Sequence, residues 1–165
     1  MYDKYGEFDS AAELNVKAFE LKSQDDEKAL IELAMENGIP TEDAEDYMDN
    51  CIQELCTPIS AAVGKLKMEA ADLNLSGVLM DWTEELIEKC LFKDGFCYAV
   101  RKKGKDLAGF IALTAEEGYE KRCVVDRRIV NKARKIKDAI GAHEFSIGIP
   151  DKKTRTELAM KYYMG

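Results

Sequence analysis

Five carboxylates between residues 42 and 49 have a spacing that suits one kind of chemistry, the electrostatic binding of a basic partner. We call these residues the acidic ridge: Glu42, Asp43, Glu45, Asp46 and Asp49. On a helix that rises about 1.5 Å per residue, all of them except Asp43 share one face over roughly 10 Å. Two interpretations fit the pattern. Acids complement the dipole in the first turn of a helix and keep a surface soluble. Alternatively, a dense carboxylate row imitates a phosphate backbone toward a basic, nucleic-acid-binding groove.

Basic side chains gather in the last third of the chain, in two groups that could contact nucleic acid or a partner protein. The first group is Arg101, Lys102, Lys103 and Lys105, and the second is Arg127, Arg128, Arg134 and Lys135. Helices over 107–117 and 126–138, with a turn at Gly118, could form a helix-turn-helix that faces DNA, although Tyr119–Val125 is long for its turn. Alternatively, these side chains face water, or pair with the acidic half of the same or a neighbouring molecule.

Motifs for catalysis and for cofactor binding are missing from the chain. His143 is the single histidine, which excludes a centre with several histidine ligands and leaves one residue for any Cys-His or Ser-His pair. Neither the Gly-x-x-x-x-Gly-Lys-Ser/Thr phosphate loop nor the dinucleotide-binding Gly-x-Gly-x-x-Gly occurs. Acids such as Asp81, Glu84 and Glu85 fit a solvated helix face. We therefore predict that the protein is not an enzyme and uses no cofactor or metal.

Helix start signals recur along the chain and indicate the elements that carry these residues. A Ser, Thr or Asp that can accept a hydrogen bond from a free amide precedes each of seven predicted helices: Ser10, Asp25 or Asp26, Thr41, Thr57, Ser76, Asp126 and Asp151. Apolar residues around Trp82 keep helical spacing and mark the expected centre of the core. Residues 123–125 and 144–149 have the character of short strands. We predict a mainly α fold (α+β), a compact bundle of short helices with a small two-stranded β element in those two segments.

The composition supports one domain that spans residues 1–165. Of the 165 residues 46% are hydrophobic, which is enough for a core. Residues 1–60 hold 16 Asp and Glu against 4 Lys, whereas residues 101–165 hold 16 Lys and Arg against 9 acids. A boundary at Asp94–Gly95 would separate an acidic helical lobe, 1–93, from a basic α+β lobe, 94–165. Such a division indicates surfaces that meet charged partners.

Cysteine usage and hydropathy indicate the cytoplasm. The five cysteines are an odd number without a Cys-x-x-Cys pair, so we expect reduced thiols in the core. The amino terminus lacks the apolar stretch of a signal peptide, and no apolar run approaches the roughly 20 residues that span a bilayer. We therefore expect no contact with a membrane.

Four segments resemble small proteins carried by phages and conjugative elements of gut Firmicutes. They are Tyr5–Asn15, Glu36–Pro40, Ala99–Lys105 and Gly148–Tyr163. Some proteins of this kind are grouped with type II anti-CRISPRs, which inhibit RNA-guided DNA nucleases, and with PcfK-like proteins of conjugative plasmids. The segments contain no catalytic signature, so the resemblance transfers no functional residue to this chain.

The resemblance implies a protein of the bacterial host cytoplasm that binds a type II CRISPR nuclease, with or without its guide RNA, and blocks DNA binding or cleavage. The acidic ridge supplies a physical route, because such nucleases hold guide and target in a positively charged channel. The alternative is a DNA-binding accessory or regulatory protein of a phage or conjugative element. Formation of a homodimer and direct contact with nucleic acid are left open.

Overall fold

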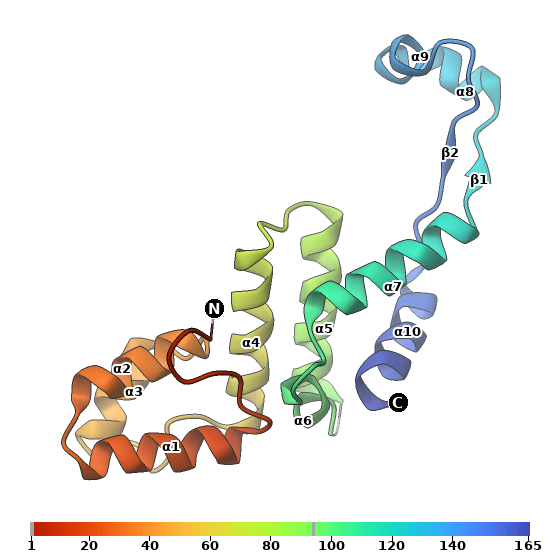
Figure 1. The fold of residues 1–165 in the computed structure, drawn as a ribbon. Coiled ribbons are helices and arrows are strands. Elements are labelled where there is room, and N and C mark those ends of the chain that lie inside the picture. The colour runs from red at the N-terminus through yellow and green to blue at the C-terminus, as the bar shows by residue number, and fades with distance from the viewer. Residues whose placement is uncertain (1, 94) are drawn as a thin grey trace.

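The chain folds as ten helices and one small β-ribbon in the computed structural model, which describes residues 2–93 and 95–165 (Figure 1). The helices are α1 (Ala11–Ser23), α2 (Glu27–Glu36), α3 (Thr41–Met48), α4 (Pro58–Asp72), α5 (Val78–Phe92), α6 (Phe96–Arg101), α7 (Leu107–Glu120), α8 (Arg127–Lys132), α9 (Arg134–Ile140) and α10 (Lys152–Met164). The strands are β1 (Cys123–Val124) and β2 (Ser146–Ile147), which pair antiparallel. The predicted mainly α fold with a small two-stranded β element is confirmed.

Short polar side chains begin most of these helices, because each can accept a hydrogen bond from an amide that has no partner within the helix. Six do so: Ser10, Asp26, Thr57, Asp106, Asp126 and Asp151. Two predicted starts are wrong. Helix α3 follows Pro40 without a side-chain cap, so Thr41 is its first residue. Helix α5 follows Gly77, whose positive φ of 56° suits glycine, and Ser76 lies one residue outside.

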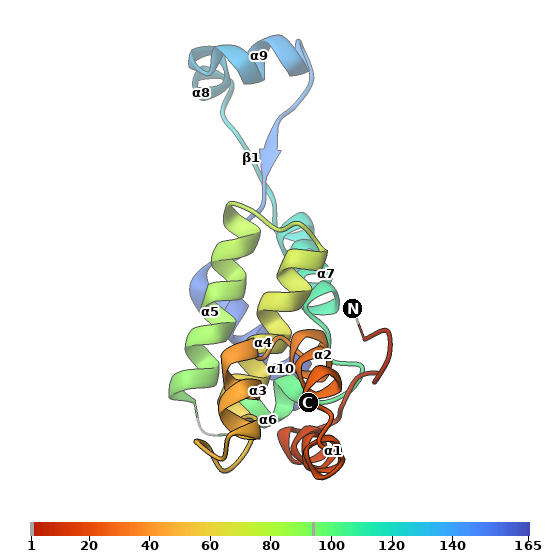
Figure 2. The same cartoon turned by 90° about the vertical axis from the view of Figure 1, so that its left-hand side faces the viewer.

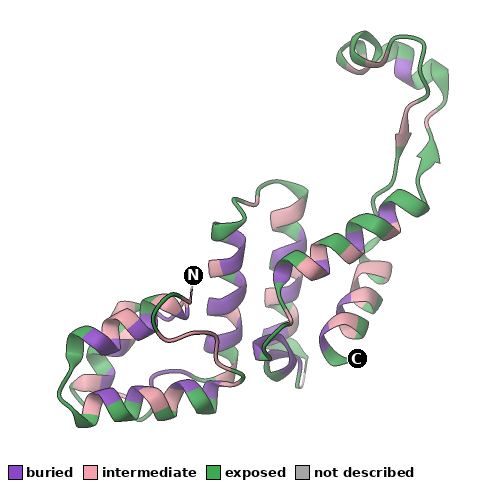
Figure 3. Cartoon of the chain, in the orientation of Figure 1, coloured by how far each residue is buried: buried purple, intermediate pink, exposed green. Residues whose placement is uncertain are grey.

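A first hydrophobic cluster fills the space between α1, α2 and α3 and reaches the start of α4. Leu14, Leu30 and Leu33 are fully buried in it, and Tyr47 is its aromatic residue from α3. Figure 3 shows the pattern as buried stripes on the facing sides of these helices, with exposed residues on the outer sides. The amphipathic spacing of the apolar residues therefore decides which face of each helix stays in water.

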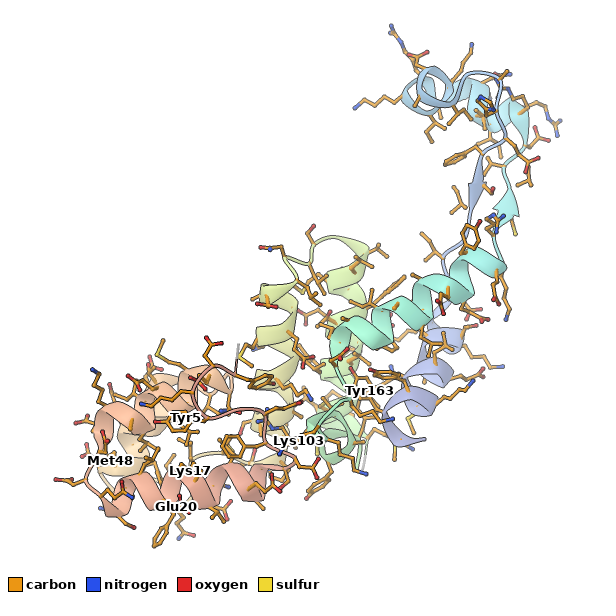
Figure 4. All side chains as sticks on the ribbon, viewed as in Figure 1. Tyr5, Lys17, Glu20, Met48, Lys103 and Tyr163 are labelled. Atoms are coloured by element: carbon orange, nitrogen blue, oxygen red, sulfur yellow. The ribbon has the colours of Figure 1, made fainter. Side chains whose placement is uncertain are left out.

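A second cluster joins α4, α5, α6, α7 and α10. It contains Trp82, which is 5% exposed, and Tyr163, which lies between α10 and α7 (Figure 4). The edge of one ring meets the face of the other where Phe96 and Tyr163 pack, with 5.5 Å between their centroids. Trp82 is thus a core residue, as its spacing predicts, although it belongs to one of two clusters.

The two clusters meet along α4. Ala61 belongs to the first and Ala62 to the second. Gly64 of α4 lies so close to Gly38 that a methyl group on either residue would overlap with the other's backbone. Asp94, the first residue of the predicted boundary, lies outside the described residues. The single domain with two lobes stays a prediction.

The segment from Cys123 to Ile147 leaves the other helices and forms an arm (Figures 1 and 2). The β1–β2 ribbon carries α8 and α9 at its far end. One helix over 126–138 was expected, but the backbone leaves the helical region at Ala133 (φ −90°, ψ 81°), so two short helices form. The helix-turn-helix does not form either, because the ribbon separates α7 from α8.

Candidate binding surfaces

The acidic ridge lies on α3 and on Asp49, the residue that follows the helix. On the other side of α3, Ala44 and Tyr47 pack into the first cluster. The ridge carboxylates are exposed except that of Asp43, which is half-buried. Within residues 2–93 and 95–165, none of the five forms a salt bridge. The four exposed carboxylates thus occupy one helix surface without a neutralising cation.

Three of the four lysines in residues 1–60 are already engaged by other groups. Lys4 pairs with Glu32 at 2.6 Å and Lys17 with Glu20 at 2.9 Å. Lys22 donates to the backbone carbonyl of Tyr47 and lies over its ring, 4.2 Å from the centroid. Because only 4 Lys stand against 16 acids in residues 1–60, the negative potential of this surface persists.

The first basic group is mainly structural. Arg101 is 1% exposed, and its Nη2 donates to Asn37 Oδ1 at 2.5 Å, so the prediction that it contacts a partner is wrong. Lys105 Nζ donates to the carbonyl of Tyr162 at 2.6 Å. Lys102 and Lys103 have exposed side chains, while their backbone groups bond to Lys65 and to Asp9. The segment therefore links the amino-terminal region, α4 and α10.

A buried ionic cluster lies beneath this segment. Lys65 Nζ is 2.5 Å from Glu7 Oε1 and 3.9 Å from Glu69 Oε1, and it donates to the carbonyl of Lys102 at 3.0 Å. Glu69 Oε2 accepts the amide of Leu107, at the start of α7, at 2.7 Å. Burial raises the pKa of Glu69 to about 7, and the Lys65 ammonium opposes this rise.

The second basic group lies on α8 and α9, at the end of the arm. Arg127 donates to the carbonyls of Gly141 and His143, which closes the loop after α9. Arg128 is bidentate to Asp126, with both distances 3.0 Å, and Arg134 lies 3.8 Å from Asp138. Lys135 has no hydrogen-bond or salt-bridge partner in the described part of the chain. His143 is exposed, next to the ribbon.

The root of the arm is held tightly. Gly118 of α7 crosses Gly148, which follows β2, and a methyl group on Gly148 would overlap with the carbonyl of Gly118. Next to this crossing, the Arg155 guanidinium is bidentate to Glu85 at 2.6 and 3.0 Å and also donates to the carbonyl of Pro150. The hydrogen bonds that the Arg155 guanidinium donates to Glu85 keep the pKa of this carboxyl below its ordinary value. These contacts fix the direction in which the arm leaves the body.

The cysteines divide into two classes. Cys56, Cys90 and Cys97 are buried, and burial raises the pKa of the Cys56 and Cys90 thiols to about 12. Cys51 and Cys123 are exposed, so the expectation that all five lie in the core is wrong for these two. All five are free thiols.

Known proteins give no further guide. No family model matches the chain, and neither the curated proteins nor the solved structures compared with it contain a match. In the described residues, no group of three or more His, Cys, Asp and Glu side chains is placed to hold a metal ion. None of the described helices has both the length and the apolar character needed to cross a membrane. The resemblance to mobile-element proteins stays a prediction.

Sequence reasoning missed three features of these surfaces. Lys132 and Lys137 belong to the basic faces of the helix predicted over 126–138 but were left out of the candidate contacts, and both are exposed and without a partner in the described residues. Lys65 and Glu69 were overlooked, although two charges four residues apart in the apolar run of α4 signal a buried pair. The Gly118–Gly148 crossing has no signal in the sequence, because the two glycines meet only when the arm folds.

Proposed function

We propose that the protein is a cytoplasmic, non-enzymatic inhibitor that binds a type II CRISPR nuclease and blocks its access to DNA through the acidic ridge. The observation that carries the proposal is the separation of charge on the folded chain. The ridge keeps its carboxylates free at one end, while the unpaired lysines of α8 and α9 are held apart on the arm (Figure 1). The resemblance to mobile-element proteins supports the same class of function.

The physical basis is competition for a basic channel. An RNA-guided nuclease holds its heteroduplex in a positively charged groove and reads a short duplex motif with arginines. Four carboxylates over roughly 10 Å of helix lie on average about 3.5 Å apart in rise, close to the spacing of roughly 3.4 Å between phosphates along one strand of a duplex. Binding of this kind needs no cofactor. The nuclease could be engaged with or without its guide RNA.

Charge removal from the ridge tests the proposal. The variant Glu42→Gln, Glu45→Gln, Asp46→Asn, Asp49→Asn keeps side-chain shape and removes four charges. Each exposed ion pair contributes about 0.2–1 kcal/mol, so loss of four should raise the concentration for half-inhibition of target cleavage by about fourfold or more. The effect should shrink as salt increases.

A matched control removes the same number of charges elsewhere. Asp72→Asn, Asp81→Asn, Glu84→Gln and Glu116→Gln alter exposed acids outside α3 that form no salt bridge in the described residues. This control should inhibit as well as the parent. Equal loss in both variants would show a net-charge effect, and a folded ridge variant with full inhibition at low salt would refute the mechanism.

The second candidate is a DNA-binding accessory or regulatory protein of a mobile element. The arm favours it, because α8 and α9 carry exposed lysines, although the helix-turn-helix that would read a base sequence is not formed. Co-purification distinguishes the two. Recovery of the nuclease with the tagged protein supports inhibition, whereas recovery of DNA without the nuclease supports the accessory role.

A further inference from the structure

The tip of the arm concentrates positive charge. Six of the eleven residues from Arg127 to Lys137 are basic and none is acidic. The neighbouring acids Asp126 and Asp138 pair only with Arg128 and Arg134. Lys132, Lys135 and Lys137 are exposed and keep free ammonium groups in the described structure. The tip is therefore a compact cationic surface.

Packing does not explain why the tip exists. Val130 is the one buried apolar residue of α8, and α9 buries none. Ile129 is 61% exposed and Val124, on the ribbon, is also 61% exposed. A segment with so little core contributes little to stability, so its extension from the body points to a binding role.

The arm is also arranged before any ligand binds. The Gly118–Gly148 crossing and the Arg155–Glu85 pair fix its root, and Val125 continues the ribbon with a 2.8 Å hydrogen bond to the carbonyl of Phe145. A surface held in place loses less conformational entropy on binding than a disordered basic tail does. It also keeps the lysines away from the acidic ridge, and charges farther apart than about 8 Å are screened in physiological salt.

We propose that this arm binds duplex DNA through its phosphate backbone, with Lys132, Lys135 and Lys137 as the main contacts. The inference is independent of nuclease inhibition, because the ridge and the arm are separate surfaces, and it deepens the second candidate function by naming the ligand and the contact residues. A two-stranded ribbon and a short helix both fit the major groove of B-form DNA, whereas the major groove of A-form duplexes is too narrow. Lysine contacts to phosphates carry no sequence information, so binding is independent of sequence.

Single strands fit the tip less well. Proteins that bind single-stranded nucleic acid stack its bases on aromatic side chains. Residues 126–144 contain no Phe, Tyr or Trp. The acidic ridge of a second copy of the protein is the alternative ligand for these lysines. Duplex DNA offers many more anionic groups along its length, and its condensed counterions are released when lysines neutralise the phosphates. These differences favour the duplex.

The test measures fluorescence anisotropy of a labelled 20-base-pair DNA duplex with the purified full chain. Three phosphate contacts predict a slope of about −2.7 for log K against log salt, which is about a 40-fold loss of affinity between 50 and 200 mM. The variant Lys132→Gln, Lys135→Gln, Lys137→Gln should remove this binding. The control Lys28→Gln, Lys67→Gln, Lys153→Gln removes three exposed lysines elsewhere and should change affinity less than twofold.

Several outcomes would overturn the proposal. They are absence of binding at 50 mM salt, an equal loss in the control, and equal or tighter binding of a single strand or an RNA–DNA hybrid. Sedimentation velocity covers the remaining alternative. If the protein binds no duplex but forms salt-sensitive dimers that the arm variant abolishes, the arm binds a second copy of the protein instead of DNA. Circular dichroism of the variant verifies that it folds. Nuclease inhibition is measured separately, so either proposal can fail without the other.

Discussion

Glu69 joins two parts of the fold through one carboxylate. One oxygen accepts a hydrogen bond from the first amide of α7, and the other faces Lys65. Both oxygens of this buried side chain, which is only 3% exposed, therefore have a partner. Burial disfavours the charged form more than these partners favour it, and the pKa rises from the ordinary 4.5 to about 7. The folded protein therefore binds this proton more tightly than the unfolded chain does.

This shift predicts a pH dependence of stability. Between pH 4.5 and 7 the folded state holds more protons than the unfolded state, so the free energy of unfolding should fall as pH rises, by roughly 2–3 kcal/mol, and level off above pH 7. Urea midpoints at pH 5, 6, 7 and 8 measure the slope. Glu69→Gln keeps an acceptor for Leu107 and should flatten it, while the exposed Glu84→Gln should leave it unchanged. The same slope in Glu69→Gln would mean that another group is responsible.

Local signals made most helix starts predictable, because a capping side chain and its amide lie within three residues. Ser10, Asp26 and Asp151 act as the sequence indicates. Arg101 was misassigned because its partner Asn37 lies 64 residues away. The break at Ala133 has no local cause in the sequence, since alanine favours a helix. Of the charged surfaces, the sequence predicted the acidic face of α3 and the exposed basic residues of α8 and α9, because the members of each group are close in sequence.

The root of the arm is the element most sensitive to a small change. Gly148→Ala would place a methyl group against the Gly118 carbonyl, so the crossing must open, at a cost of about 2 kcal/mol. Amide hydrogen exchange should accelerate in residues 119–148 and stay unchanged in α1–α5. Gly141→Ala is the control within the arm, because its φ of 58° is unusual for alanine but its methyl group meets nothing within 4 Å, so it introduces local strain without a clash. Indistinguishable exchange in the two variants would contradict a tight crossing.

At the scale of the whole molecule, two charged surfaces are placed far apart by a shared scaffold. The arrangement depends on long-range contacts, chiefly Gly38 with Gly64 and Gly118 with Gly148, which single residues in the sequence do not reveal. Helix α4 contributes to both hydrophobic clusters. If one cluster unfolded, apolar residues of α4 would be exposed and the other cluster would lose part of its packing. The stabilities of the two halves are therefore coupled.

This coupling predicts that the body unfolds as one unit. Trp82 fluorescence reports on the second cluster, and a dye on the exposed Cys51, in a Cys123→Ser background, reports on the first. The two probes should give the same urea midpoint. Gly64→Ala crowds the backbone of Gly38 and should lower both midpoints together, by an amount that corresponds to about 2 kcal/mol or more. Two separate transitions, with the Cys51 probe changing first, would show that the acidic helices form an independent domain, and the ridge would then be presented by a unit that can move relative to the arm.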